Sequence, residues 1–195
     1  MVNAIILAAG ESKRMGKLKP LLKFKDKTFL DQIISVLKLS DVDMITVVLG
    51  AEAETVKKSV DLSGTKVLVN EAYERGQLSS LIIAIENAPE ETEAILLCLV
   101  DNPFITKEVV NKIISTFKKT NSPIIVPVFN KKRGHPTLFS KSLFDELLDA
   151  PEAQGARYVL YSNEKRVFEL ETSESRILIG IDTPEDYKLH FEVNP

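Results

Sequence analysis

The sequence predicts an α/β fold in which helices flank a layered, mostly parallel central sheet. Two observations support this prediction: short runs of consecutive apolar residues recur along the chain, and stretches with helical spacing of apolar residues separate them. Consecutive apolar residues are typical of strands covered on both faces, as in parallel sheets. Strand–helix alternation at this spacing favours right-handed crossovers between the strands.

The apolar runs locate the expected strands. Five runs are expected to form most of the sheet: Asn3–Ala9, Met44–Leu49, Lys66–Val69, Ala94–Val100 and Ile124–Val128. Two later segments are expected to add strands: Val167–Leu170 and Arg176–Ile179. Ligands bind beyond the carboxyl ends of strands in such sheets, so the loops after Ala9, Val69 and Val100 are the first places to look for a site.

Helical periodicity locates the expected helices. One apolar face is shared by Leu30, Ile33, Ile34 and Leu37. A second face follows Thr106, a suitable N-cap residue, and consists of Val109, Val110, Ile113, Ile114 and Phe117. Two further helices are expected over Leu78–Glu86 and Ser142–Leu148.

Length and composition exclude several classes of protein. The 195 residues predict a single domain over 1–195, and 44% hydrophobic with 27% charged residues is typical of a globular chain. A net charge of −3 argues against general nucleic-acid binding. No apolar run approaches the roughly 20 residues of a membrane span, and the N-terminus lacks the features of a signal peptide. We therefore expect a cytoplasmic protein without membrane contact, and the oligomeric state stays open.

Cysteine and histidine are scarce. Cys98 is the only cysteine, so no intrachain disulfide can form, and its place within an apolar run predicts a small core residue. The histidines are His135 and His190, which are too few to build a structural zinc site with one cysteine. No local pattern typical of a Ser-His-Asp or Cys-His triad is present.

A glycine-bracketed basic loop follows the first predicted strand. The loop contains Gly10 and Gly16, and four cations lie within a stretch of seven residues: Lys13, Arg14, Lys17 and Lys19. Glycine lets backbone N–H groups approach an anion, and Arg and Lys bind phosphate oxygens, so the loop suits a triphosphate. It is neither a Walker A loop nor a dinucleotide fingerprint, because the glycine spacing differs from both. The alternative is a solvated basic loop with turn glycines.

Six sequence blocks resemble a known family. Residues 7–19 read Leu-Ala-Ala-Gly-x-Ser-x-Arg-Met-Gly-x-x-Lys, which resembles the signature of nucleotidyltransferases similar to molybdenum cofactor cytidylyltransferase and its guanylyl relatives. Five later blocks match this family in the same order: 76–81 (Gly-Gln-Leu-Ser-Ser-Leu), 101–103 (Asp-Asn-Pro), 133–136 (Arg-Gly-His-Pro), 155–157 (Gly-Ala-Arg) and 181–187 (Ile-Asp-Thr-Pro-Glu-Asp-Tyr).

The resemblance implies a fold and a reaction. The fold is a three-layer, Rossmann-like nucleotidyltransferase fold with a mostly parallel, mixed central sheet. The reaction is metal-dependent transfer of a nucleotide from an NTP to a phosphorylated small-molecule acceptor, with release of pyrophosphate. Ala8-Ala9 resembles the cytidylyl version of the loop rather than the guanylyl version, which implies CTP as donor and the molybdopterin form of the molybdenum cofactor as acceptor. The implied metal is Mg²⁺, with Mn²⁺ as the alternative.

The resemblance also implies roles for individual residues. The phosphates would be held by the catalytic residues Arg14 and Lys19. The nucleotide would be bordered by Leu7, Ala8, Ala9, Gly10, Gly16, Gly76, Ser79 and Ser80. The acceptor would face Arg133, His135 and Arg157. The metal would be bound by Asp101, with Asp182 as the second candidate ligand.

Asp101 and Asp182 each have a structural alternative. Asp101 follows a buried strand and faces the expected cleft, where a carboxylate can hold magnesium, but it can equally cap a turn. Asp182 precedes a helix start with Thr183 as N-cap and Pro184 at N1. The family pattern commonly has an acid where this chain has Gly180. Either Asp182 replaces that acid, or Asp101 and the phosphates hold the metal alone, or activity is weakened.

The acceptor residues also leave alternatives open. Lys131 and Lys132 precede Arg133, and an anionic acceptor would be drawn to this basic segment. His135 is either an acceptor-facing residue or a surface loop histidine that bonds backbone, and Arg157 can equally lie on a helix surface.

Three other functions fit parts of the sequence. The same loop suits a nucleotidyltransferase for sugar phosphates or other small acceptors. Gly180 favours a non-catalytic nucleotide-binding or cofactor-delivery protein. Strand–helix alternation fits a Rossmann-type oxidoreductase, although the missing GxGxxG counts against it.

Overall fold

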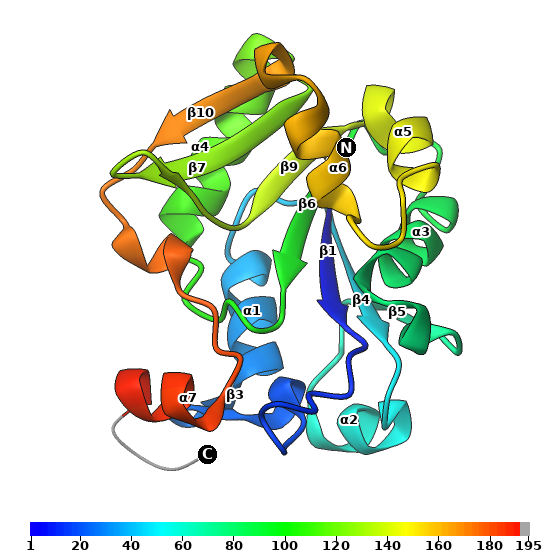
Figure 1. Ribbon diagram of the computed structural model, residues 1–195, viewed down its shortest axis with the longest axis vertical. Helices are drawn as coiled ribbons and strands as arrows, with labels where there is room; N and C mark the ends of the chain where they lie inside the picture. Colours follow the sequence, from blue (N-terminus) through cyan, green and yellow to red (C-terminus); the bar gives the residue numbers. More distant parts are fainter. Residues whose placement is uncertain (192–195) are drawn as a thin grey trace.

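The computed structural model describes residues 1–191, and its centre is an eight-stranded sheet. The strand order is β10-β7-β9-β6-β1-β4-β5, and β8 pairs with β7 at the side (Figure 1). The strands of this sheet are β1 (Val2–Ala8), β4 (Met44–Leu49), β5 (Lys66–Val69), β6 (Ala94–Leu99), β7 (Ile124–Phe129), β8 (Lys132–Arg133), β9 (Thr137–Ser140) and β10 (Val167–Glu171). A separate hairpin consists of β2 (Lys23–Phe24) and β3 (Lys27–Thr28).

The sheet is mixed and mostly parallel, which confirms the predicted fold class. β1 lies between β4 and β6, and both pairings are parallel, as are β4 with β5 and β7 with β10. β9 is antiparallel to β6 and β7, and β8 is antiparallel to β7. The carboxyl ends of β1, β4 and β6 therefore meet at one edge, where a site is expected.

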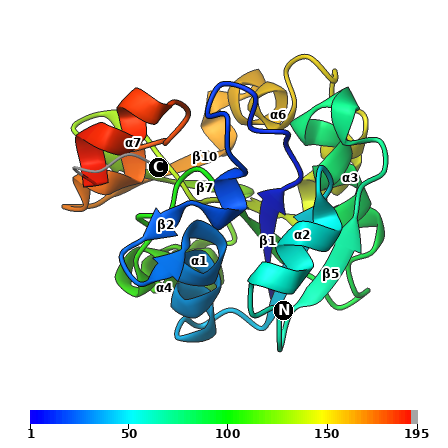
Figure 2. The same cartoon turned by 90° about the horizontal axis from the view of Figure 1, so that it is seen from below.

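Helices cover both faces of the sheet. The α-helices are α1 (Phe29–Lys38), α2 (Ala53–Ser59), α3 (Gln77–Glu86), α4 (Lys107–Thr120), α5 (Phe144–Leu148), α6 (Ala156–Ser162) and α7 (Pro184–Phe191). Short 3-10 helices are η1 (Lys19–Leu21), η2 (Tyr73–Arg75), η3 (Lys141–Leu143), η4 (Glu164–Arg166) and η5 (Ser175–Leu178). Figure 2 shows α1 and α4 on one side of the sheet and α3 and α6 on the other. No helix within residues 1–191 has the length and apolar character needed to cross a bilayer.

The continuous apolar runs of the sequence follow from this layering. In β1, Ala4 and Ile6 face the core shared with α1 and α4, whereas Ile5 and Leu7 face the core shared with α3, α5 and α6. Alternate residues of one strand thus enter two different cores, and neither face tolerates a polar residue easily. Cys98 lies in the first core, as expected, and burial raises the pKa of its thiol to about 12.

An aromatic cluster ties α7 to the start of α1. Tyr187 stacks on Phe29 and Phe191, with ring centroids 6.0 and 4.7 Å apart. The Tyr187 hydroxyl donates to the carbonyl of Lys23, at 2.8 Å. Since α7 follows the segment that holds Asp182, this packing fixes where that carboxylate lies relative to the rest of the molecule.

One predicted strand is wrong. Arg176–Ile179 does not join the sheet, because residues 175–178 form η5. The carboxylate of Glu174 accepts from the Arg176 backbone N–H and begins this turn, and only Ile177 of it is buried. Strand β9 and helices α2 and α6 were not predicted, since each is short and lacks a clear apolar period.

The predicted cap of α4 offers a direct stability test. The Thr106 hydroxyl accepts from the Val109 N–H at 3.3 Å, which satisfies one of the unpaired donors at the helix start. Thr106→Ala should lower the free energy of unfolding by about 1 kcal/mol in urea denaturation. Thr120→Ala, the same change at the exposed end of α4, is the control and should cost clearly less. Equal losses for both variants would contradict the cap.

Candidate functional site

A cavity of about 330 Å³ opens where β1 and β6 end. Its walls come from the loop after β1, from η2 and the start of α3, from the end of β6 and from the segment before α7. We call it the loop cavity. The predicted site residues that line it are Leu7, Ala9, Gly10, Arg14, Lys19, Gly76, Ser80, Asp101 and Asp182. The predicted residues Ala8, Gly16 and Ser79 are not part of its lining.

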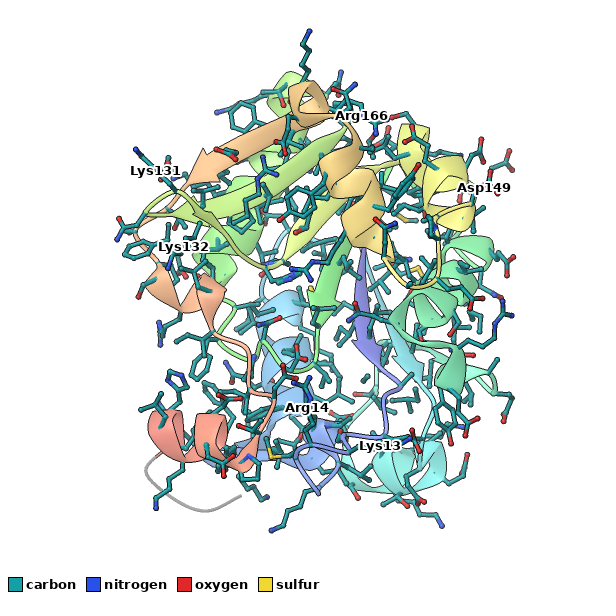
Figure 3. All side chains as sticks on the ribbon, viewed as in Figure 1. Lys13, Arg14, Lys131, Lys132, Asp149 and Arg166 are labelled. Carbon is teal, nitrogen blue, oxygen red and sulfur yellow. The ribbon has the colours of Figure 1, made fainter. Side chains whose placement is uncertain are left out.

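An ion cluster lies at the floor of the loop cavity. The Lys19 ammonium Nζ is 3.1 Å from Asp101 Oδ2 and 2.5 Å from Asp182 Oδ1. Arg14 Nη2 is 3.1 Å from the same Asp182 oxygen. The Lys19 side chain is only 13% exposed, whereas that of Arg14 is 71% exposed, so Lys19 is the inner cation and Arg14 the outer one. Figure 3 shows Arg14 near the ends of the central strands.

Local turns explain why the basic loop holds this shape. The carbonyl of Ser12 accepts from the N–H groups of Met15 and Gly16, both at 3.0 Å. The Ser12 hydroxyl accepts from the Lys19 N–H, also at 3.0 Å. The Met15 side chain is buried in the core and anchors the tip of the turn. The loop is therefore folded back on Ser12, and this fold directs Lys19 inward.

Backbone contacts bring Asp182 to the end of β6. The Ile181 N–H donates to the Asp101 carbonyl at 2.8 Å, and Asn102 Nδ2 donates to the Ile179 carbonyl at 2.7 Å. Asp186 Oδ2 accepts from the Asp182 N–H at 3.0 Å and so holds the turn before α7. Nothing in the sequence indicated that the Asn102 side chain holds the segment before α7, although Asn102 lies inside the Asp-Asn-Pro block.

The carboxylates of Asp101 and Asp182 suit a divalent metal that is completed by phosphates. Their oxygens converge on one cation, the Lys19 ammonium, so the chain already holds a positive charge at this point. Magnesium commonly takes one or two carboxylates and fills its other positions with water and substrate phosphates. Within residues 1–191, no group of three or more acidic, histidine or cysteine side chains forms a metal cage of its own. The geometry therefore fits the alternative in which Asp182 stands in for the acid missing at Gly180.

A buried asparagine supports the α3 wall of the loop cavity. Asn70 follows β5 and is 0% exposed. Its Nδ2 donates to the hydroxyls of Ser79 and Ser80, at 2.8 and 2.9 Å. Ser79 donates in turn to the Gly76 carbonyl at 2.7 Å, so it supports the loop from behind the cavity wall. A polar residue directly after the apolar run of β5 was the only sequence signal for Asn70.

A second cavity, of about 270 Å³, lies between α6 and the face of β6, β7 and β9. We call it the α6 cavity. The three predicted acceptor residues line it: Arg133, His135 and Arg157. Gln77 and Leu99 line both cavities, so the two spaces adjoin at these residues.

Arg133 is engaged within the chain. Its guanidinium pairs with Glu164 and with Glu169, the latter through Nη2 at 2.8 Å, and lies 5.4 Å from the ring centroid of Tyr161. The hydrogen bonds to these glutamates raise the pKa of Arg133. Arg157 has no ion pair within residues 1–191, which leaves it as the cation of the α6 cavity that can meet an anionic group.

His135 is not a surface histidine. Its Nδ1 is buried and has no hydrogen-bond partner within residues 1–191, which overturns the alternative of a surface residue that bonds backbone. Burial lowers the pKa of its imidazole, Asp101 opposes this shift and Arg157 adds to it. The side chain is therefore neutral near pH 7, so one ring nitrogen can donate a hydrogen bond and the other can accept one.

Lys131 and Lys132 do not reach either cavity. Asn130 and Lys131 have φ of 48° and 63°, which suits a two-residue turn between the antiparallel strands β7 and β8. Figure 3 shows both lysines at the outer edge of the molecule, far from Arg14. The expectation that they draw an acceptor into the site is wrong, because the hairpin carries them away from it.

Comparison with known proteins places this architecture among nucleotide-handling enzymes. A family profile described as "MobA-like NTP transferase domain" matches residues 4–167. The molybdenum cofactor cytidylyltransferase of Escherichia coli is 30% identical over 188 residues, which cover 95% of this chain and 93% of that protein.

Two further relatives cover nearly the whole chain. The crystal structure of Rv0371c from Mycobacterium tuberculosis has a TM-score of 0.89 at 30% identity and covers 98% of this chain and 97% of its own. A structure of that protein in complex with manganese has a TM-score of 0.85 at 26% identity. The nicotine blue oxidoreductase of Paenarthrobacter nicotinovorans is 25% identical over 201 residues, 96% of each protein.

The lowered pKa of His135 predicts a specific pH dependence of stability. The unfolded chain binds the imidazole proton first, near the ordinary value of 6.5, while the folded chain still excludes it. The stability that the neutral, buried imidazole contributes is therefore complete above about pH 6.5, and it is lost as the pH falls through the folded-state pKa. In urea denaturation at a series of pH values, His135→Gln should lose less stability on acidification than the unaltered chain. Parallel curves for the two proteins would contradict the burial of a neutral imidazole.

Proposed function

Because this chain belongs to the MobA-like NTP transferase family and is a nucleotidyltransferase, we propose that it transfers CMP from CTP to a phosphorylated acceptor of the molybdopterin type. Pyrophosphate is the second product. The observation that carries the proposal is the Lys19 ammonium between Asp101 and Asp182, at the end of a folded basic loop. This arrangement offers both a phosphate clamp and the carboxylates for a divalent metal.

The reaction needs no nucleophile from the protein. An oxygen of the acceptor phosphate attacks the α-phosphorus of CTP, the new P–O bond forms, and the bond to pyrophosphate breaks. Lys19 and Arg14 neutralise the negative charge that gathers on the leaving pyrophosphate, and the loop cavity holds the nucleotide in line with the acceptor. Mg²⁺ held by Asp101 and Asp182, or Mn²⁺ in its place, would supply Lewis-acid polarisation of the phosphates.

Lys19 has two alternative sets of partners in this proposal. In the structure its ammonium neutralises the carboxylates of Asp101 and Asp182. With a metal–nucleotide complex bound, Asp101 and Asp182 would hold the metal in exchange for the ammonium, and Lys19 would bind the phosphates. Every charge is paired before and after the exchange, so no carboxylate in this partly buried site is left alone.

The acceptor is assigned to the α6 cavity. This space adjoins the loop cavity at Gln77 and Leu99, so an acceptor seated there extends its phosphate toward the nucleotide. Arg157 would bind an anionic group of the acceptor, and neutral His135 would form a hydrogen bond to it. Arg133 holds the wall of the cavity through its glutamate partners.

The choice of CTP rests on the loop and on one relative. Ala8 and Ala9 follow the cytidylyl version of the loop, and the Escherichia coli relative is named for transfer of a cytidylyl group. Pyrophosphate release should be measured with CTP, GTP, UTP or ATP, each with Mg²⁺ and the molybdopterin form of the molybdenum cofactor. We expect turnover with CTP and at least tenfold less with the other three nucleotides.

Other outcomes of this assay would overturn the proposal. Turnover with GTP alone would refute the assignment of CTP. Binding of CTP by calorimetry without pyrophosphate release would favour a non-catalytic nucleotide-binding protein. Binding of NAD(P)H without binding of any NTP would favour the oxidoreductase alternative.

Lys19→Ala separates the two roles of this residue. Loss of the clamp should lower kcat/KM about 10²- to 10³-fold. The same change frees Asp101 and Asp182 from their counter-ion, so the nucleotide-free variant should bind Mn²⁺ more tightly than the unaltered chain in electron paramagnetic resonance titrations. Lys23→Ala, at an exposed lysine of β2, is the control and should change neither quantity. Weaker Mn²⁺ binding by Lys19→Ala would contradict the exchange.

A further inference from the structure

The amide of Asn70 has only one possible orientation. Its Oδ1 accepts from the backbone N–H of Ala72 at 2.9 Å, and a backbone N–H can only donate. The oxygen must therefore face Ala72, and Nδ2 must face the serine hydroxyls. Both hydrogens of Nδ2 are used, one for each serine, so this buried side chain donates twice.

This orientation dictates how the two hydroxyls are used. Each serine oxygen accepts a hydrogen from Asn70, so each must direct its own hydrogen elsewhere. Ser79 directs its hydrogen to the Gly76 carbonyl, at 2.7 Å. Ser80 donates to no acceptor within residues 1–191, and its side chain lines the loop cavity at 2% exposure. The one direction left for its hydrogen is the cavity.

We propose that Asn70 is a positioning residue that makes Ser80 an obligate hydrogen-bond donor to a carbonyl oxygen of the bound nucleobase. This inference rests on the proposed function, because it takes the loop cavity to hold the nucleoside. A base that presents an N–H or NH₂ group at Ser80 would bring two donors together in a desolvated place. Such a base binds more weakly, because both donors would be buried without an acceptor and each unpaired donor lowers the binding affinity.

Asn70→Asp reverses this polarity with almost no change of shape. A carboxylate still accepts from the Ala72 N–H, but it also accepts from the Ser80 hydroxyl and so turns the Ser80 lone pairs toward the ligand. Ser80→Ala removes the donor altogether. Ser115→Ala, the same kind of change at an exposed serine of α4 that lines neither cavity, is the control.

The experiment measures the dissociation constant of CTP with Mg²⁺ by calorimetry, together with thermal unfolding of each variant. Asn70→Asp and Ser80→Ala should each weaken binding by about three- to tenfold. The double variant should bind no more weakly than Ser80→Ala alone, because Asn70 acts through Ser80. Ser115→Ala should change binding less than twofold. If the losses of CTP affinity add up in the double variant, Asn70 does not act through Ser80 and its positioning role is overturned.

Nucleotide analogues identify the oxygen that Ser80 meets. In 2-thio-CTP, sulfur replaces the carbonyl oxygen of the base. This analogue should bind more weakly than CTP to the unaltered chain, whereas Ser80→Ala should bind the two nucleotides equally well. A selective loss with 2′-deoxy-CTP instead would place a ribose oxygen at Ser80 and refute the base assignment. If Asn70→Asp fails to fold, Ser80→Ala still tests the proposal, because an unchanged affinity of that variant for CTP overturns it. Absence of CTP binding by the unaltered chain would refute the proposed function itself.

Discussion

The ammonium of Lys19 joins three segments that lie far apart in the sequence. It contacts Asp101 after β6 and Asp182 before α7, and its own backbone is held by Ser12 in the loop after β1. A largely buried cation of this kind requires partners, and the partners require it, because an unpaired charge there would be costly. This set of contacts joins the loop, the turn after β6 and the segment before α7 at one point, in addition to the hydrogen bonds and aromatic packing that shape each of them.

The sheet explains why these contacts form at all. Parallel strands β1 and β6 end side by side, which places the basic loop and Asp101 at one edge. The antiparallel strand β9 then opens a second space beneath α6, next to the first. Two adjoining cavities with shared walls suit the proposed transfer between two bound molecules, since both reactants must be held in line. The hydrogen bonds of Asn70 and the neutral His135 add polarity to these cavities at single, fixed points.

Much of this fold could be predicted from the sequence. Runs such as Met44–Leu49 and helices such as α1 are strongly patterned, and the Thr106 cap is a local signal. The short strand β9 could not be predicted, because its four residues owe their conformation to neighbours on both sides. The apolar residues of Arg176–Ile179 predict a strand, but this segment forms η5, in which Ile177 is buried and Leu178 is exposed.

The site was predictable in part. The motif blocks led to Lys19, Asp101 and Asp182, but only the structure shows that they share one point. The engagement of Arg133 by Glu164 and Glu169 depends on contacts more than 30 residues apart, which no local pattern reveals. Asn70 likewise gains its importance from the orientation of a single amide.

A crystal structure of the complex with CTP and Mg²⁺ tests the central claim most directly. The account predicts metal density between the carboxylates of Asp101 and Asp182, with the Lys19 ammonium moved onto the phosphates. Lys19 still paired with both carboxylates, and the nucleotide bound outside the loop cavity, would contradict it.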